Sequence, residues 1–283
     1  MAYVTYECNI PIRLDRYLNI NYKITHGIIE KFLRKGLIKV SGCRCKANLR
    51  LNKGVTVYIA DSIVNGTSFR GRAKKKKNQF SNKIINFTNK YFSSWVIYED
   101  KNIIAINKPG NISTQGGTNV DLSIDHILQY LNHTTLEKFR LVHRLDKKTS
   151  GILLIAKNRE SAIKLTKAFK ESKIKKIYIA VLKGVVLKEK GTITSIIDGK
   201  KSITNYFLVK QKSPDINLVI FKPITGRKHQ LRKHALELGC RIIGDSSKKN
   251  EPMLLHALEI SIDKEVMGSE ITIKTEIPKI FDI

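Results

Sequence analysis

The sequence predicts an α+β fold, in which helices flank a mixed or antiparallel central sheet and a small N-terminal α/β module precedes it. After Trp95, apolar segments of strand length outnumber amphipathic helical segments, and the two kinds do not alternate one for one. The chain contains no Gly-x-Gly-x-x-Gly and no P-loop motif, which argues against a doubly wound nucleotide-binding sheet. Its 283 residues suffice for one domain of about 200 residues and one small module.

Residues 1–61 are predicted to form the small module. Apolar side chains at helical spacing indicate two helices within residues 12–35, and Gly36 ends the second one. Segments 37–40 and 55–59 read as short strands. The module carries a cluster of cationic side chains that we predict to contact RNA: Arg34, Lys35, Arg44, Lys46 and Arg50.

The polar and strongly basic residues 62–90 are predicted to form a linker to a second domain at residues 91–283. In that domain, strands are expected at 96–98, 103–106, 151–156, 177–182, 192–197, 203–210 and 217–222. Helices are expected at 123–131, after Asn158 and at 228–238. The wholly apolar segment 151–156 should lie in the centre of the sheet.

Charge limits the class of partner. The chain has 52 Lys and Arg against 24 Asp and Glu, a net charge of +28, and the excess is densest in the first 90 residues. Some lysines are ordinary surface residues, because Lys, Ile and Asn are used heavily throughout. The clustering nevertheless favours a nucleic acid over a membrane as the partner.

Other features of the composition predict a cytoplasmic protein. No run of 18 apolar residues is present, so no transmembrane helix is expected, and the N-terminus lacks the pattern of a signal peptide. Cys43 and Cys45 have no second matching pair, so the four cysteines are expected to be free thiols.

The segment 141–151, LVHRLDKKTSG, is the strongest candidate for chemistry. It places Asp146 among cationic neighbours, in a loop between two predicted strands that ends at a glycine. Loops held by a rigid sheet are common sites of catalytic groups, although an arbitrary aspartate in such a loop is more often part of a salt-bridged surface turn.

Residues 143–151 resemble the HRLDxxTSG motif of the RluA family of pseudouridine synthases. Four further segments are similar to this family in order and spacing: 98–110, 176–181, 221–234 with TGRKHQLRKH, and 255–257. The resemblance covers about residues 91–262, and it is greatest to members that act on the large ribosomal subunit. The N-terminal module is similar to an S4 RNA-binding domain, although Gly54-Val55 stands where that family commonly has Gly-Asp.

The resemblance implies the pseudouridine synthase fold, isomerisation of specific uridines in ribosomal RNA, and no cofactor. Asp146 would be the nucleophile and Tyr178 the active-site tyrosine, which offers a flat face for the base and a hydroxyl group. Arg232 is the predicted ion-pair partner that keeps Asp146 charged, with Arg227 as the alternative. An opposite charge close to a carboxylate favours its ionised form.

Three more residues are expected to contact RNA: Arg144 beside the nucleophile, Arg227 at the start of a helix, and His229. Base extrusion is required because the glycosidic carbon is inaccessible in a stack, and Arg144 could fill the space that the uridine leaves. His229 and His234 are five residues apart rather than four, so no metal site is expected.

Two rival functions are compatible with parts of the sequence. A catalytically silent RNA-binding or ribosome-assembly factor on the same fold is the first, but the intact set of Asp146, Tyr178 and Arg232 disfavours it. A carboxylate-nucleophile hydrolase is the second, but the chain lacks the acidic pair and the metal ligands that it needs. We expect a monomer, and the sequence does not indicate which uridines are modified or whether the RNA is free or in an assembling subunit.

Overall fold

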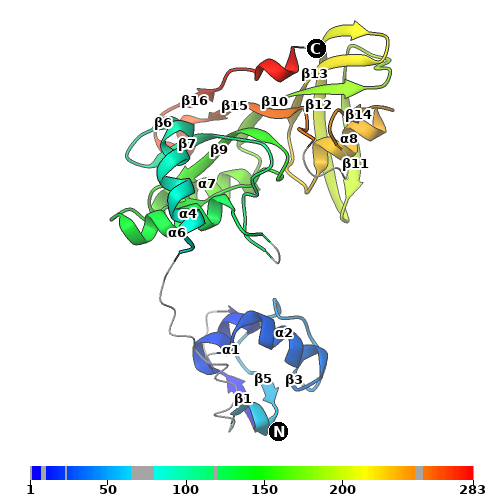
Figure 1. The fold of residues 1–283 in the computed structure, drawn as a ribbon. Coiled ribbons are helices and arrows are strands. Elements are labelled where there is room, and N and C mark those ends of the chain that lie inside the picture. The colour runs from blue at the N-terminus through cyan, green and yellow to red at the C-terminus, as the bar shows by residue number, and fades with distance from the viewer. Residues whose placement is uncertain are drawn as a thin grey trace. The chain divides into compact units, whose positions relative to one another are not determined.

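The chain forms two units with separate hydrophobic cores, residues 1–79 and residues 80–283. The computed structural model describes residues 2–7, 11–22, 24–64, 80–117, 120–245 and 251–282. Figure 1 shows the elements of each unit.

The first unit packs two helices against small sheets. Its elements are β1 (Ala2–Tyr6), β2 (Ile12–Arg13), α1 (Leu14–Tyr22), α2 (His26–Arg34), β3 (Ile38–Val40), β4 (Arg50–Leu51), β5 (Val55–Ile59) and α3 (Asp61–Val64). The strand order is β1-β5-β3, all antiparallel, and β2 pairs with β4. Leu14 and Leu18 of α1 and Ile29 and Phe32 of α2 are buried in its core. The predicted helices and strands are therefore present, and the likeness to an S4 domain stays a prediction.

The second unit begins with three short helical segments and continues with strands and helices in mixed order. The first elements are α4 (Asn82–Phe87), the π-helix Thr88–Phe92, α5 (Ser93–Trp95), β6 (Val96–Glu99), β7 (Ile103–Lys108), α6 (Ile124–Thr134), β8 (Arg140–Leu141), β9 (Ser150–Ala156) and α7 (Arg159–Lys170). The remaining elements are β10 (Ile174–Lys183), β11 (Lys190–Ile197), β12 (Lys200–Ser213), β13 (Ile216–Pro223), α8 (Gln230–Glu237), β14 (Arg241–Ile242), β15 (Leu255–Ile262), α9 (Lys264–Met267), β16 (Ile271–Lys274) and the 3₁₀ turn Lys279–Phe281.

One mixed sheet of eleven strands organises the second unit and confirms the predicted α+β class. Its main order is β11-β12-β13-β10-β15-β9-β7-β6, with β14, β16 and β8 pairing with β10, β15 and β9. All of these pairs are antiparallel except β9 with β15. As predicted, the apolar segment 151–156 is internal to the sheet and buried on both faces.

Alternation along the central strands directs side chains to two different helical layers. In β9, Ile152 and Leu154 share a cluster with Leu165 of α7, whereas Leu153 and Ile155 share one with residues of α6. This is the period of two expected of a strand. At the other end of the sheet, α8 packs against β11 and β12 (Figure 1).

The linker was predicted to extend too far along the chain. Residues 82–90 of the predicted linker 62–90 form α4 and the first three residues of the π-helix in the second unit. The Oγ of Ser81 accepts a hydrogen bond from the backbone N–H of Ile84 and caps α4, and both Ile84 and Phe92 are buried. The run Lys74–Lys77 lies outside the described residues.

In the part of the chain that the structure describes, no helix is both long enough and apolar enough to span a membrane.

Candidate active site

Asp146 lies in the loop between β8 and β9, and the backbone of this loop is fixed from two directions. Thr114 donates through Oγ1 to the carbonyl of Leu145 at 2.6 Å and accepts from the N–H of Leu145 at 3.1 Å. The N–H of Thr149 donates to the Asp146 carbonyl at 3.1 Å, which closes the turn. The Asp146 side chain is 17% exposed, so it is accessible from a largely buried position.

The start of β9 sets where this loop ends. Ser150 and Gly151 pair in parallel with His256 and Ala257 of β15, and the Ser150 Oγ is 2.8 Å from the His256 Nδ1. Gly151 has φ of 103°, and a Cβ there would lie 2.3 Å from the Ala257 carbonyl oxygen. Only glycine fits this close approach between strands, so the contact explains why the motif ends in Gly.

Lys108, at the end of β7, is hydrogen-bonded to the backbone of this loop. It is fully buried, and its Nζ donates to the carbonyl oxygens of Pro109, Ile112 and Lys147 at 2.8, 3.0 and 3.4 Å. Burial lowers the pKa of Lys108 to about 7, and the nearby Asp146 carboxylate opposes this shift. The sequence pattern did not single out Lys108, although a lysine that ends the apolar segment IIAIN was a possible signal.

Tyr178, on β10, approaches Asp146 from another part of the sheet. Burial, together with the Asp146 carboxylate, raises the pKa of Tyr178 above its ordinary value. The phenol is therefore neutral at neutral pH, and it can donate a hydrogen bond but does not act as a phenolate.

The predicted ion pair between Arg232 and Asp146 is wrong in this structure. Arg232, on α8, forms a two-point ion pair with Asp245, with Nη2–Oδ1 at 2.6 Å and Nε–Oδ2 at 3.0 Å. Arg227, the alternative, donates through Nε to the carbonyl of Lys201 at 3.2 Å. Among the described residues, the basic side chain that approaches Asp146 within 4 Å is His229, with Nε2–Oδ1 at 3.7 Å.

The backbone at the start of α8 explains why His229, and not Arg232, lies next to Asp146. His229 precedes the helix with φ of 56° and ψ of 24°, in the left-handed region that a non-glycine residue rarely adopts. This backbone brings the imidazole to Asp146, and Arg232, nearly one turn later, lies beside Asp245. Burial lowers the pKa of His229 despite the Asp146 carboxylate, and nearby cations, Arg232 foremost, lower it further.

All six residues predicted for the second domain line one cavity of about 380 Å³: Arg144, Asp146, Tyr178, Arg227, His229 and Arg232. The structure therefore brings together residues that are up to 88 positions apart in the sequence. Asp146 is the only carboxylate among the described residues of its wall, and the other charged side chains there are cationic. In the described chain, no group of three or more His, Cys, Asp or Glu side chains is placed to hold a metal ion.

The first unit contains a separate groove, lined in part by Arg34, Arg44 and Lys46. The other two predicted RNA contacts, Lys35 and Arg50, are not part of its wall. Within the described residues, none of these five cations has an ion-pair partner, which leaves them available to an anion.

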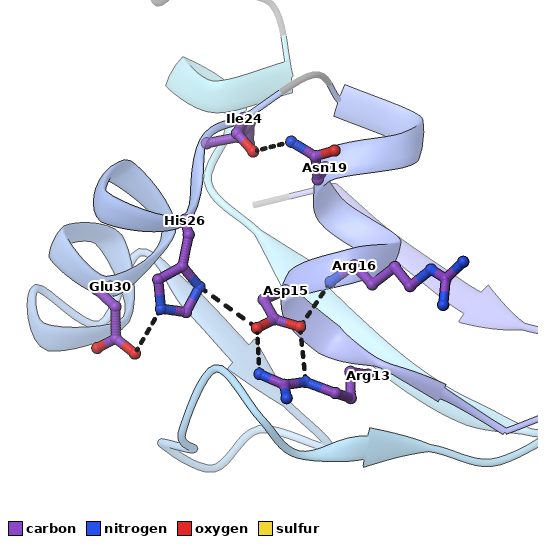
Figure 2. A network of polar contacts seen from close by, with 7 residues as sticks. All are labelled: Arg13, Asp15, Arg16, Asn19, Ile24, His26 and Glu30. Carbon is purple, nitrogen blue, oxygen red and sulfur yellow. Dashed lines mark hydrogen bonds and ion pairs between the residues drawn. The ribbon is translucent and has the colours of Figure 1, made fainter. Parts of the chain in front are cut away.

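Figure 2 shows the polar network beside this groove, in which Asp15 is central. Asp15 accepts from Arg13 at 3.1 and 2.6 Å, and the His26 Nδ1 lies 3.3 Å from the same carboxylate. The His26 Nε2 also lies 3.8 Å from Glu30. The network therefore joins the start of α1 to α2 and neutralises Arg13, whereas no described carboxylate pairs with Arg34 or Arg44.

Comparisons with known proteins agree with the geometry of the cavity. Residues 102–237 match the family model described as RNA pseudouridylate synthase. The chain is 41% identical over 303 residues to the ribosomal large subunit pseudouridine synthase C of Rickettsia bellii (strain RML369-C), which covers 99% of each chain. It is 40% identical to the protein of that name from Rickettsia prowazekii (strain Madrid E), with 96% of each chain covered.

Solved structures share the fold. Human RNA pseudouridylate synthase domain containing 4 superposes with a TM-score of 0.60 at 23% identity, covering 71% of this chain and 94% of that one. Human RNA pseudouridylate synthase domain containing 1 gives a TM-score of 0.52 at 26% identity, covering 64% and 82%.

Proposed function

The chain belongs to the RNA pseudouridylate synthase family, and from this premise we propose that it converts specific uridines of large-subunit ribosomal RNA to pseudouridine, with Asp146 as the nucleophile. One observation carries the assignment of Asp146: it is the only carboxylate among the described residues that line the cavity, close to Tyr178 and surrounded by cations. The ribosomal substrate is the one that the names of the Rickettsia relatives state.

The reaction breaks the C1′–N1 bond of uridine, turns the uracil and forms a C1′–C5 bond. C5 loses a proton and N1 gains one, so substrate and product are isomers and no oxidant or reductant is consumed. In the proposed path, the Asp146 carboxylate attacks C1′ and uracil departs through N1. C5 of the turned uracil then displaces the carboxylate, which restores Asp146.

The residues around Asp146 suit these steps. The neutral phenol of Tyr178 gives the base a flat face and one hydrogen-bond donor. Arg144 is exposed beside the nucleophile, where it can fill the gap left by an extruded uridine or hold its phosphate. Arg227 and Arg232 add cationic groups to the wall that faces the RNA, and the His229 imidazole adds a hydrogen-bonding group.

We propose that the first unit binds RNA as an S4-like module through the cations of its groove, and that the residues before α4 connect it to the catalytic unit. Arg34, Arg44 and Lys46 support this role, because none of them has a carboxylate partner in the described part of the chain and such cations attract phosphate. We also propose that the enzyme acts as a monomer in the cytoplasm; its one chain would hold both the binding module and the catalytic residues.

The test of the nucleophile is Asp146→Asn, which replaces a carboxylate by an amide of nearly the same shape. Pseudouridine formation at saturating protein should fall by at least ~10³-fold, the scale of loss when a nucleophile is removed, while RNA affinity stays within a few-fold. Asp198→Asn is the matched control, because Asp198 is an exposed aspartate paired with Lys233 at 3.5 Å. Activity of Asp146→Asn within tenfold of wild type would exclude Asp146 as the nucleophile.

The ribosomal substrate is tested by mapping pseudouridines in RNA from cells with and without the protein. Sites in large-subunit RNA should lose the modification, and Asp146→Asn should fail to restore it. Modification losses confined to other RNAs would overturn the substrate assignment and leave the chemistry intact.

A further inference from the structure

The cavity that holds Asp146 extends to the start of β10, where Lys176 forms part of its wall. Lys176 and Tyr178 are two residues apart on this strand, so both side chains point to the same face. At a rise of about 3.3 Å per residue, their Cα atoms are roughly 6.6 Å apart along the strand. A nucleotide whose base and ribose lie at Tyr178 and Asp146 can therefore extend its backbone toward Lys176.

Lys176 differs from Lys173 and Lys175 in having no partner among the described residues. Lys175, on the opposite face of β10, pairs with Asp263 at 3.0 Å, and Lys173 pairs with Glu171 at 3.6 Å. Within the described residues, the Lys176 ammonium group has neither a hydrogen bond nor an ion pair. Burial lowers the pKa of Lys176 to about 8, as expected for a half-buried amine whose charge nothing compensates.

The neighbouring side chains cannot supply the missing negative charge. His143 stacks on Phe169 with ring centroids 4.4 Å apart, and its Nε2 accepts a hydrogen bond from the N–H of Leu154 at 2.8 Å. Burial lowers the pKa of His143 to about 3, and the charge of Lys176 contributes to this shift, so the ring is neutral. Asp146, the only carboxylate on the described cavity wall, lies beyond ion-pair distance of Lys176.

We propose that Lys176 binds a backbone phosphate of the RNA next to the uridine that enters the cavity. This inference rests on the proposed function, since it assumes that RNA enters the cavity with its target base near Asp146. A phosphate would supply the negative charge that no described side chain places beside Lys176. The exposed Lys170 and Ser172 also line the cavity, and they make its wall polar and accessible to RNA.

The test compares full-length Lys176→Met with Lys175→Met in filter-binding titrations across a range of salt concentrations. The probes are ten-nucleotide oligouridylate and oligoadenylate. Lys176→Met should weaken binding to both probes by about 3- to 10-fold and reduce the slope of log affinity against log salt by about 0.7, the value for one phosphate contact on a single strand. Lys175→Met should leave the slope unchanged, and Lys176→Arg, which keeps the charge, should retain it.

Two results would overturn the proposal. An unchanged salt slope in Lys176→Met would mean that Lys176 does not contact phosphate. A loss confined to oligouridylate would mean that it contacts the base, since phosphate contacts carry no sequence information. Pseudouridine formation by the wild-type protein on a large-subunit RNA transcript is measured separately, so failure of the proposed function is distinguishable from failure at Lys176.

Discussion

Replacing Gly151 with alanine should damage both the stability of the second unit and the position of Asp146. The new Cβ would lie 2.3 Å from the Ala257 carbonyl oxygen and 2.5 Å from the Ala257 nitrogen, and both are backbone atoms of β15 that cannot rotate away. The positive φ of 103° adds about 1–2 kcal/mol of strain for an L-residue. Separation of the strands adds roughly 1–3 kcal/mol, the usual cost of overpacking.

The total cost is about 2–5 kcal/mol, which corresponds to a fall in Tm of roughly 4–20 °C for a unit of this size. The assay is thermal unfolding followed by the fluorescence of Trp95, the only tryptophan of the chain, which lies in the second unit. Gly199→Ala is the matched control, because Gly199 has φ of 72° but nothing within 4 Å of an added Cβ.

The control therefore carries strain without a steric clash, and the difference between the two variants isolates the clash with β15. Pseudouridine formation by Gly151→Ala, measured well below its Tm, should also fall, because β9 starts directly after the catalytic loop. If Gly151→Ala were no less stable than Gly199→Ala, the close contact between β9 and β15 would not constrain the loop as we argue.

Three further predictions concern other parts of the molecule. In the folded protein the pKa of Lys108 is lowered to about 7, so above pH 7 the unfolded state binds more protons than the folded state. The free energy of unfolding of the wild type should therefore rise above pH 7 by about 1.4 kcal/mol per pH unit. Lys108→Met should lack this rise, so the Tm of the variant minus the Tm of the wild type should become more negative from pH 7 to pH 9. A Tm difference that does not change with pH would refute the titration of Lys108. Asp245→Asn should destabilise the second unit by about 1.5–3 kcal/mol in urea unfolding, because it leaves Arg232 without its charged partner, whereas the exposed control Asp198→Asn should cost less than about 1 kcal/mol. Deletion of residues 1–79 should preserve the Trp95 unfolding transition and flatten the salt dependence of RNA binding, and equal salt slopes for both proteins would argue against RNA contact by the first unit.

The sequence was sufficient to predict the fold class and the residues that line the cavity. Periodicity predicted the five longest helices, α1, α2, α6, α7 and α8, and more than half of the strands, and the apolar segment 151–156 is central as expected. The motif around Asp146, together with the segments that contain Tyr178 and Arg232, predicted which residues would meet. The order of the motifs predicts this because loops at one edge of a sheet lie close together in space even when they are far apart in the sequence.

The pairing of side chains was not predictable in the same way. Arg232 was assigned to Asp146 because a nearby opposite charge favours an ionised carboxylate, but next to the left-handed backbone of His229 it is the imidazole that lies beside Asp146, and Arg232 pairs with Asp245. Lys108 was overlooked because lysine is normally a surface residue, and only the three-dimensional arrangement shows the carbonyl oxygens that accept its hydrogen bonds. The helix α4 was not predicted because only one of its six residues, Ile84, is buried, which is too few for an apolar periodicity to be recognised in the sequence.

The position of β15 in the sheet has a consequence for the order in which the enzyme can mature. This strand lies between β9, which follows the Asp146 loop, and β10, which carries Tyr178, yet it follows both of them in the sequence. A nascent chain that has emerged only to residue 254 contains every proposed catalytic residue but lacks the strand that joins the two parts of the sheet. Catalytic competence should therefore arise only after β15 has emerged, so that chains that stop before this strand do not modify RNA.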